Sequence, residues 1–354
     1  MENKSFQIYW KSILKLTPKQ TETKKILINN MKSCYEFKKY DCICGSNDFE
    51  NIISKDIMGI PAFIIICKKC GLIFQNPRLS EKSLNDFYAN FYYDLYSSAV
   101  NEEDEYKEMI ERGRLIYEYI NNKIPEFLNS VKNILEVGCN KGGIISAFSK
   151  NGYNVMGIDL DPNAVKFANT KNINVQLTDI NSFAKNNTQK FDLVIYNHVL
   201  EHISDINNEM KLIKTLLTEN GYIYIGVPSL LYGLKANRWH FQSHVIFDHI
   251  YYFNRETLRN TMSFCGFKEV ACDDSPVINN IKGLHLFAVY QCKNYDEKKI
   301  TIENQYYDNI AILSYAESKC KNIGHIILVN TIKIISRILP TKFKMFIRRL
   351  FKIL

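Results

Sequence analysis

The sequence predicts an α/β protein whose mostly parallel sheet carries helices on both faces. Between residues 131 and 292, short apolar runs alternate with amphipathic stretches, as expected for strands connected by helices. A glycine-rich loop at 138–143 follows the first run and opens the first helix. Asp159 ends the next run, 21 positions after Gly138, which is the spacing of one strand–helix–strand unit. These observations indicate a doubly wound sheet that binds a nucleotide-like ligand at the carboxyl ends of its strands.

Seven strands are expected, each a short apolar run between turn residues. In chain order they are Asn133 to Val137, Asn154 to Ile158, Asn174 to Leu177, Phe191 to Tyr196, Tyr222 to Val227, Glu269 to Cys272 and Leu284 to Gln291. Apolar residues at helical spacing predict helices at Ile144 to Lys150, Pro162 to Asn169, Ile203 to Leu217 and Arg255 to Phe264. No segment repeats with a fixed period, which argues against a solenoid.

Periodicity and composition divide the chain into five expected parts. They are a polar N-terminal segment (1–40), a module with paired cysteines (41–80), a helical bridge (81–130), the α/β domain (131–292) and a helical C-terminal region with a basic amphipathic tail (293–354).

The charge of the chain is concentrated at its C-terminal end. The 354 residues carry a formal net charge of +8, and residues 321–354 contain eight lysines and arginines and no acid. The rest of the chain is therefore neutral, which argues against an extended face that follows nucleic-acid phosphates. We expect no nucleic-acid partner.

The sequence favours a cytoplasmic protein. Ten cysteines are too few for a disulfide framework, and the N-terminus lacks the pattern of a secretory signal. The longest apolar stretch, Ile326 to Leu339, is interrupted by Lys333 and Arg337, so no transmembrane span is expected. As a helix, residues 341–354 would place aromatic and basic side chains on opposite faces. That pattern fits peripheral contact with the inner face of a membrane, and equally a helix packed on the protein itself.

Two cysteine pairs predict a structural zinc site. Cys42-x-Cys44 and Cys67-x-x-Cys70 could supply four thiolates to one Zn²⁺, and in a reducing compartment this spacing favours metal over disulfide. The first pair is irregular, because Asp41 stands where a regular Cys-x-x-Cys pair would begin. Free buried cysteines are the alternative.

Several segments of the α/β domain resemble class I S-adenosylmethionine-dependent methyltransferases. Glu136-x-Gly138-x-Asn140-x-Gly142 is similar to that family's Glu-x-Gly-x-Gly-x-Gly loop, and Asp159 matches its ribose-binding acid. The run from Leu177 to Ile180 falls where the family presents an aspartate to the adenine, and Phe191 to Ile203 resembles the fourth strand and the Glu-His pair after it. The resemblance covers about residues 130–292.

This resemblance implies a Rossmann-like, seven-stranded domain that binds S-adenosyl-L-methionine. The cofactor-binding residues that it implies are Glu136, Gly138, Asn140, Gly142, Asp159, Leu160, Asp179, Ile180 and Asn197. In methyl transfer the donor already carries its activation, so the enzyme mainly aligns donor and acceptor. Any acid–base group is then secondary. His198 and His202, which follow the fourth strand, could take a direct chemical role, and the alternative is that Glu201 and His202 cap or order the following helix.

The acceptor site is expected in the long segment from Ser229 to Asn254, which is rich in histidines and aromatic residues. A histidine beside a carboxylate suits proton removal, which makes His249, with Asp248, the candidate base. The segment from Ile246 to Phe253 resembles the Tyr-His-Glu-His-x-x-Tyr-Phe segment of methyltransferases that act on nucleotide-linked deoxysugars. Ile246 replaces the first tyrosine, which leaves both carbon and oxygen methylation open. Asp248 and His249 could instead only close a loop over the cofactor.

The cysteine module also resembles the N-terminal module of those sugar methyltransferases. Together these patterns predict a methyltransferase that modifies a nucleotide sugar or another glycan precursor in polysaccharide biosynthesis. A methyltransferase for another small molecule or a lipid-like quinone is one alternative, and a non-catalytic nucleotide-binding module is another. A nicotinamide oxidoreductase is disfavoured, because its loop needs glycine where this chain has Asn140.

Overall fold

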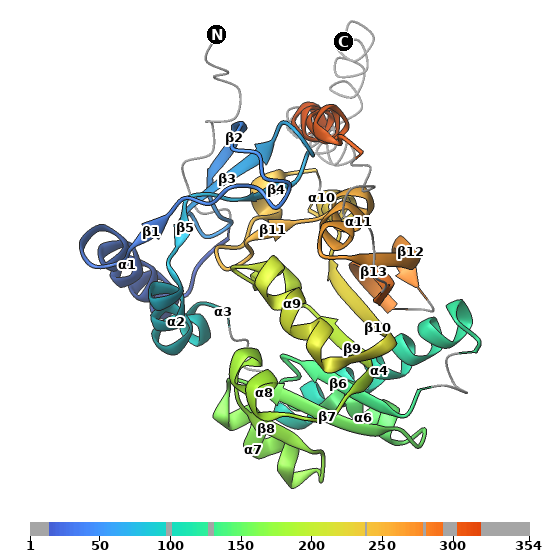
Figure 1. The fold of residues 1–354 in the computed structure, drawn as a ribbon. Coiled ribbons are helices and arrows are strands. Elements are labelled where there is room, and N and C mark those ends of the chain that lie inside the picture. Colours follow the sequence, from blue (N-terminus) through green and yellow to red (C-terminus); the bar gives the residue numbers. More distant parts are fainter. Residues whose placement is uncertain are drawn as a thin grey trace, which may run out of the picture.

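The computed structural model describes residues 14–96, 101–126, 131–237, 239–278, 281–292 and 303–319. A large sheet with helices on both faces lies beside a smaller sheet formed mainly by the N-terminal part of the chain (Figure 1). Most of the predicted basic tail, including residues 341–354, lies outside the described residues.

The larger sheet has seven strands in the order β12-β13-β10-β9-β6-β7-β8. Their bounds are β6 Asn133–Val137, β7 Asn154–Asp159, β8 Val175–Leu177, β9 Phe191–Asn197, β10 Leu217–Pro228, β12 Phe267–Ile278 and β13 Ile281–Cys292. Adjacent strands from β10 to β8 are parallel, whereas β13 is antiparallel to both β10 and β12. The α/β fold with a mostly parallel seven-stranded sheet is therefore confirmed.

The strand order reverses between β6 and β9. The chain moves outward from β6 to β7 and β8, then returns to place β9 on the other side of β6. Ligands of open α/β sheets bind at such a switch point, outside the carboxyl ends of the strands. The loop after β6 and the turn after β9 therefore meet where a ligand is expected.

Alternate residues of the central strands pack against different helices, as the pleat of a strand requires. Leu135 and Val194 contact one core, which includes residues of α8 (Ile180–Asn186), α9 (Ile206–Leu216) and α11 (Arg255–Phe264). Ile134 and Leu193 contact the other, which includes residues of α4 (Glu102–Lys123) and α6 (Gly143–Ser149). Both faces of the sheet are covered.

The four predicted helices are present with small shifts at their ends. Besides α6, α9 and α11, they include α7 (Pro162–Thr170). The start of α9 falls three residues after the predicted start at Ile203, because Asp205 accepts a hydrogen bond from the N–H of Asn208 and caps the helix there. The sequence did not predict α8 or the short α10 (Leu230–Ala236).

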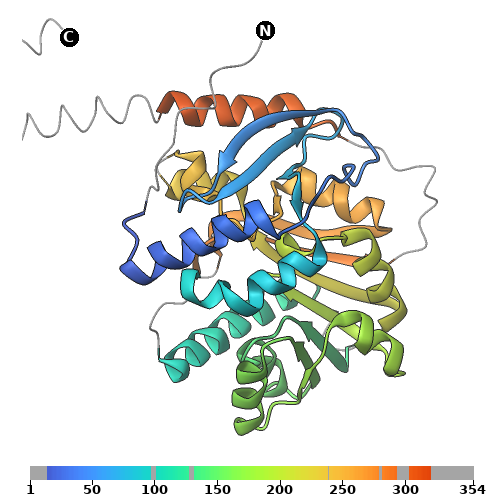
Figure 2. The same ribbon diagram turned by 90° about the vertical axis from the view of Figure 1, so that its left-hand side faces the viewer.

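The N-terminal part contains a four-stranded sheet flanked by helices. This part of the chain begins with α1 (Pro18–Ser33), which Thr17 caps. It continues with the strands β1 (Phe37–Lys38), β2 (Phe49–Lys55), β3 (Pro61–Cys67), β4 (Ile73–Gln75) and β5 (Arg78–Leu79). Strands β2, β3 and β4 belong to the four-stranded sheet, whereas β1 and β5 pair with each other. The helices α2 (Glu81–Asn90), α3 (Tyr92–Tyr96) and α4 then lead to the large sheet. In Figure 2, α1 and α2 lie side by side on the face turned to the viewer.

One strand of the smaller sheet comes from the α/β part of the chain. β11 (Tyr251–Tyr252) pairs with β4 in antiparallel register, with Tyr251 opposite Phe74, and the sheet order is β11-β4-β3-β2. The four paired cysteines belong to the same hydrophobic core as Ile250 and Phe253. The cysteine module and the α/β domain therefore share both a sheet and a core.

The last described helix covers the smaller sheet. Residues 306–319 are helical and lie beside β2 and β3 in both views (Figures 1 and 2). Asn309 Nδ2 donates to the carbonyl oxygen of Gly71 at 2.9 Å and thereby ties this helix to the turn after the second cysteine pair. Within the described residues, no helix combines the length and the hydropathy that a membrane span requires.

Candidate functional site

The loop after β6 has a backbone in which alternate residues are left-handed. Gly138, Asn140 and Gly142 have φ values of 66°, 48° and 70°. Asparagine tolerates this conformation better than most residues, because its short polar side chain can form local hydrogen bonds. Asn140, which stands where the motif of the resembled family has glycine, therefore has a left-handed backbone that glycine could also adopt.

Asp159, at the end of β7, holds this loop from the neighbouring strand. Its Oδ2 accepts the backbone N–H of Asn140 at 2.6 Å, and its Oδ1 accepts that of Asp161 at 2.9 Å. Burial raises the pKa of this carboxyl, and the backbone hydrogen bonds oppose the rise. The predicted cofactor residues Asn140 and Asp159 are thus in direct contact.

Two leucines next to the predicted aspartates are exposed despite their size. Leu160 follows Asp159 and is 70% exposed, and Leu177 lies two residues before Asp179 and is 56% exposed. A flat aromatic ligand bound beside Asp159 and Asp179 would cover such exposed apolar side chains. The sequence analysis named Leu177 only as a strand end and as the start of the run that contains Asp179, because its exposure is visible only in the fold.

The other predicted cofactor residues differ in their surroundings. The Glu136 side chain is buried, burial raises its pKa well above the usual range, and Oε2 has no hydrogen-bond partner among the described residues. Asp179 caps α8 by accepting the N–H of Ser182 at 2.9 Å, and hydrogen bonds from Ser182 lower its pKa. Ile180 is 7% exposed. Asn197 is buried, and its Oδ1 has no partner in the described part of the chain.

The turn after β9 packs directly on the glycine loop. A Cβ atom at Gly138 would lie 2.6 Å from Cγ2 of Val199, closer than real contacts allow. His198, the preceding residue, has a φ of 58°, a left-handed conformation that histidine seldom adopts. This contact brings the His198–His202 segment beside the loop predicted to hold the cofactor.

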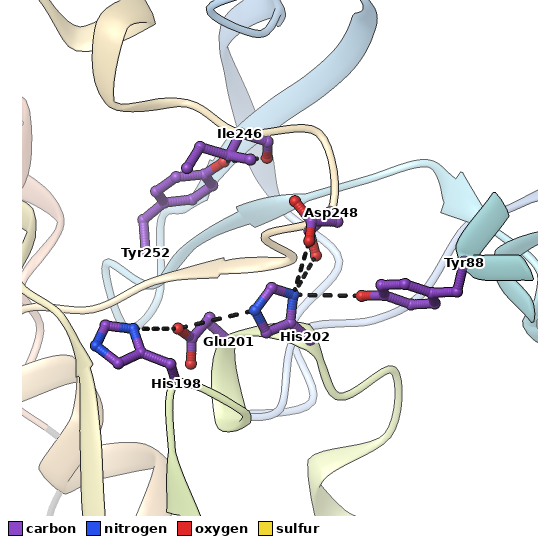
Figure 3. Close-up of polar contacts among 7 residues, drawn as sticks. All are labelled: Tyr88, His198, Glu201, His202, Ile246, Asp248 and Tyr252. Atoms are coloured by element: carbon purple, nitrogen blue, oxygen red, sulfur yellow. Dashed lines mark hydrogen bonds and ion pairs between the residues drawn. The ribbon is translucent and has the colours of Figure 1, made fainter. Parts of the chain in front are cut away.

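A buried network of acids and histidines follows this turn (Figure 3). The side chain of Glu201 is fully buried, and its Oε1 lies 3.2 Å from Nδ1 of His198 and 3.9 Å from Nε2 of His202. On its other side, Nδ1 of His202 lies 3.3 Å from Oδ2 of Asp248 and 3.0 Å from the Asp248 carbonyl oxygen. The two carboxylates therefore flank the His202 ring.

These neighbours determine the charges of the network. Burial disfavours a charged His202, but Asp248 and Glu201 outweigh it and raise the pKa of His202 to about 9. Burial likewise opposes ionisation of Glu201, but the histidines around it lower its pKa to about 2. For His249, burial and the nearby His202 lower the pKa to about 4. At neutral pH His202 is charged and His249 is neutral.

Asp248 and His249 are adjacent in sequence, but Asp248 forms its ion pair with His202. His249 packs edge-on against that ring, with ring centroids 4.8 Å apart and planes at 86°. Tyr88 Oη, from α2, is 3.3 Å from Nδ1 of His202. The sequence analysis missed this contact, because Tyr88 and His202 are 114 positions apart and no motif around Tyr88 indicates that the two side chains meet.

Other histidines and aromatics of the predicted acceptor segment are part of the packing. His244 is 8% exposed, and a Cβ at Gly233 would lie 2.1 Å from its Cε1. Trp239 packs edge-on against Tyr315 of the last helix, with ring centroids 5.0 Å apart. The network around His202 is therefore the main polar cluster of this segment.

The four predicted zinc ligands come together in space. All four cysteines are buried, Sγ of Cys42 lies 3.5 Å from that of Cys70, and Sγ of Cys44 lies 3.6 Å from that of Cys67. A tetrahedral zinc with Zn–S bonds of about 2.3 Å places its sulfurs roughly 3.8 Å apart. The cluster therefore fits a four-thiolate metal site.

The α/β part of the chain is similar to a known protein family. Residues 110–271 match the family model described as a methyltransferase domain. The match begins in α4 and ends in β12, so it includes the glycine loop, Asp159 and the network around Glu201. This part of the chain is similar to the methyltransferase domains that the model describes.

Curated relatives carry methyltransferase names. A ubiquinone biosynthesis O-methyltransferase of Coxiella burnetii is 30% identical over 99 residues, which cover 26% of this chain and 42% of the relative. The enzyme of the same name from Glaesserella parasuis is 31% identical over 117 residues, covering 30% and 49%. The chain spans about half the length of the curated relatives it matches.

Several solved structures that resemble this chain are named as methyltransferases. A SAM-dependent methyltransferase from Archaeoglobus fulgidus matches 54% of this chain and 100% of its own, with 18% identity and a TM-score of 0.40. The plantazolicin methyltransferase BpumL, solved with S-adenosylhomocysteine (SAH), matches 54% and 89%, with 16% identity and a TM-score of 0.42.

Proposed function

We propose that this protein transfers the methyl group of S-adenosyl-L-methionine to a small-molecule acceptor. The observation that carries the proposal is the loop at 138–142, whose left-handed backbone is held by Asp159 at the switch point of the sheet. Backbone N–H groups and a carboxylate at this position suit the methionine and ribose parts of an adenosyl ligand. The methyltransferase match over residues 110–271 supports the same activity.

The cofactor would be held by the residues that the family resemblance implies. Glu136, Gly138, Asn140 and Gly142 would surround its methionine part, and Asp159 would accept hydrogen bonds from its ribose. Leu160, Asp179 and Ile180 would form the adenine end, and Asn197 would lie where the strand β9 meets the methyl donor. The exposed side chain of Leu160 supports an aromatic ligand at this end.

On the acceptor side, the proposal assigns catalysis to His249 and the positioning of His202 to Asp248. An uncharged His249 has a ring-nitrogen lone pair available for ionising the acceptor. Asp248 contacts His202 through both its carboxylate and its backbone carbonyl, so it acts through that ring.

We further propose that the acceptor is a nucleotide sugar or another glycan precursor. The resemblance of residues 246–253 to the sugar methyltransferases, and the presence of a cysteine module before the domain, support this class of acceptor. A quinone-like acceptor is the second candidate, because the curated relatives are named ubiquinone biosynthesis O-methyltransferases. The cytoplasm is the proposed location for either reaction.

A structural Zn²⁺ held by Cys42, Cys44, Cys67 and Cys70 completes the proposal. The short sulfur–sulfur distances and the burial of all four thiols support it. The metal would crosslink the turn before β2 to the turn between β3 and β4.

The activity can be tested with tritiated methyl transfer from S-adenosylmethionine into two panels, one of nucleotide sugars and one of catechols and quinols. Transfer into one panel identifies the acceptor class, and His249→Ala should abolish it without weakening SAH binding by calorimetry. Absence of any heat of binding with SAH, in a protein shown to be folded, would contradict the proposal.

A further inference from the structure

We propose that Glu201, His202 and His249 form a second metal site, which takes a divalent transition-metal ion at the carboxyl end of β9. The site is additional to the cysteine cluster and lies in the network beside the glycine loop. It rests on the proposed function and deepens it with a different means of ionising the acceptor. In the metal-bound protein His249, proposed above as the base, would instead be a ligand, and the cation would ionise the acceptor.

The three side chains already present ligand atoms to a common point. One carboxylate oxygen of Glu201 and one ring nitrogen from each histidine all lie within 4.8 Å of one another. Zinc-like ions bind nitrogen and carboxylate oxygen at about 2.0–2.2 Å, which places ligand atoms roughly 3.3 Å apart. Small side-chain rotations would therefore close the site around an ion.

Glu201 has a buried oxygen that lacks a partner. The side chain is fully buried, and among the described residues Oε2 accepts no hydrogen bond. A buried carboxylate needs compensation by hydrogen bonds, a counter-charge or a metal ion. A cation between Glu201 and the two histidines would supply what this oxygen lacks.

The neighbouring carboxylate orients one of the ligands. Oδ2 of Asp248 lies 3.3 Å from Nδ1 of His202, on the side of the ring opposite to Glu201. With Nδ1 donating to Asp248, the incoming cation would displace the proton from Nε2, the atom that faces Glu201, and bind the lone pair left there. This is the carboxylate–histidine–metal arrangement found behind many metal-binding histidines.

The donor set selects the class of metal. Two imidazoles and one carboxylate suit Zn²⁺, Fe²⁺, Co²⁺ or Mn²⁺, whereas Mg²⁺ and Ca²⁺ prefer oxygen ligands throughout. Three protein ligands also leave at least one coordination position open. An oxygen of the acceptor can occupy that position.

The chemical step then has a defined balance. An acceptor hydroxyl bound to the cation loses its proton to solvent, and the resulting oxyanion stays on the metal. Its electron pair forms the new bond to the methyl carbon as the carbon–sulfur bond breaks. The sulfonium becomes the neutral thioether of SAH, and the acceptor leaves as its methyl ether.

The test is a titration of the full-length, zinc-loaded protein with Co²⁺, followed by visible absorption. We expect one equivalent of Co²⁺ with weak ligand-field bands and no thiolate charge-transfer band, since the new ligands are nitrogen and oxygen. His249→Ala and Glu201→Gln should remove this equivalent. Asp248→Asn should weaken it by about 10–100-fold, as loss of an orienting carboxylate does. His285→Ala, a nearby imidazole outside the ligand set, should leave it unchanged.

Two results would overturn the inference. The first is that the parent protein binds no Co²⁺, or only Co²⁺ that shows thiolate charge-transfer bands. The second is that the equivalent lacking these bands still binds in both the His249→Ala and the Glu201→Gln variant. Circular dichroism of each variant establishes that it is folded, and the titration of the parent protein alone is decisive if a variant does not fold. Calorimetry with SAH on the same samples separates the two proposals. SAH binding without cobalt binding rejects the metal site and leaves the methyltransferase proposal standing.

Discussion

The backbone N–H of Gln75, in the cysteine module, donates to the carbonyl oxygen of Ile250 at 2.7 Å, one residue after His249. On the other side, the N–H of Ile250 donates to the carbonyl oxygen of Glu201, also at 2.7 Å. The segment that carries the proposed catalytic histidine is therefore fixed between the cysteine module and the turn after β9. The backbone of the cysteine module and the backbone of the proposed site are therefore linked through the two hydrogen bonds of Ile250.

This link predicts the effect of disrupting the metal site proposed for the cysteine cluster. Cys67→Ser should lower zinc content and speed hydrogen exchange at the amides of Tyr251 and Tyr252 by at least about tenfold, the effect of ~1.4 kcal/mol. The glycine loop should still bind SAH. Cys272→Ser, a buried cysteine in β12 outside the cluster, is the matched control. Unchanged exchange in a zinc-free Cys67→Ser protein would show that the module does not order the segment.

Asp159 should contribute strongly to cofactor affinity. Asp159→Asn removes the charge and one of the two acceptors, so we expect SAH to bind about 10–100-fold more weakly, the usual effect of losing a hydrogen bond to a charged group. Calorimetry measures this change. Asp192→Asn is the control, because Asp192 accepts backbone hydrogen bonds from Lys132 and Asn133 at the opposite edge of the sheet. Equal affinity in both variants would place the ribose elsewhere.

Asn140 is predicted to act through its backbone conformation. Asn140→Gly should leave SAH affinity and stability nearly unchanged, whereas Asn140→Ala should cost about 1 kcal/mol of unfolding free energy and weaken SAH binding. Asn172→Ala provides the control, since Asn172 is also left-handed, with a φ of 57°. That variant should lose stability but keep its affinity. A strong loss of affinity in Asn140→Gly would instead assign the role to the amide side chain.

Asp56 makes stability depend on pH. The residue is fully buried between β2 and β3, Oδ1 accepts the N–H of Ile60 at 2.6 Å, and burial raises its pKa from 3.8 to about 7. The charged or titratable groups that interact with it are Lys24 of α1, Tyr96 of α3, Asp248 and Tyr252. Lys24 opposes the rise in pKa and Asp248 adds to it.

Because the folded-state pKa lies above the unfolded one, folding opposes ionisation of Asp56. Its contribution to stability is intact below pH 3.8 and is lost as the pH rises toward 7. Asp56→Asn cannot ionise and therefore removes this loss. The difference in unfolding free energy between Asp56→Asn and the parent should increase by about 2–3 kcal/mol from pH 5 to pH 8, as measured by urea unfolding. The exposed Asp104→Asn should follow the parent. Parallel curves for Asp56→Asn and the parent would contradict the assignment.

Local patterns predicted much of the large sheet. β6 and α11 have the predicted bounds, because apolar periodicity, the glycine loop and the Asn254 cap are all local signals. The six other predicted strands and the three other predicted helices are present, with ends that differ from the predicted ones by up to six residues. The carboxyl-edge positions of Asn140 and Asp159 followed from the same strand–loop–helix spacing.

Contacts between distant segments were not predictable in this way. The pairing of β11 with β4 joins residues more than 170 positions apart, and no local property of Tyr251 or Phe74 encodes it. For the same reason Asp248 was assigned to its sequence neighbour His249, although its partner in space is His202. Tyr88 entered the network through the packing of α2, which the sequence shows only as an amphipathic helix.

The strand that β11 contributes to the smaller sheet limits how this chain could be rearranged. A fragment beginning at residue 131 would leave Tyr251 and Tyr252 as an unpaired edge and would uncover the apolar side chains of Ile250 and Phe253. Exchanging the first 80 residues for those of a relative would require matching changes at 250–253. The first 80 residues and residues 250–253 should therefore be exchanged together. A chimaera that exchanges only one of the two segments should aggregate.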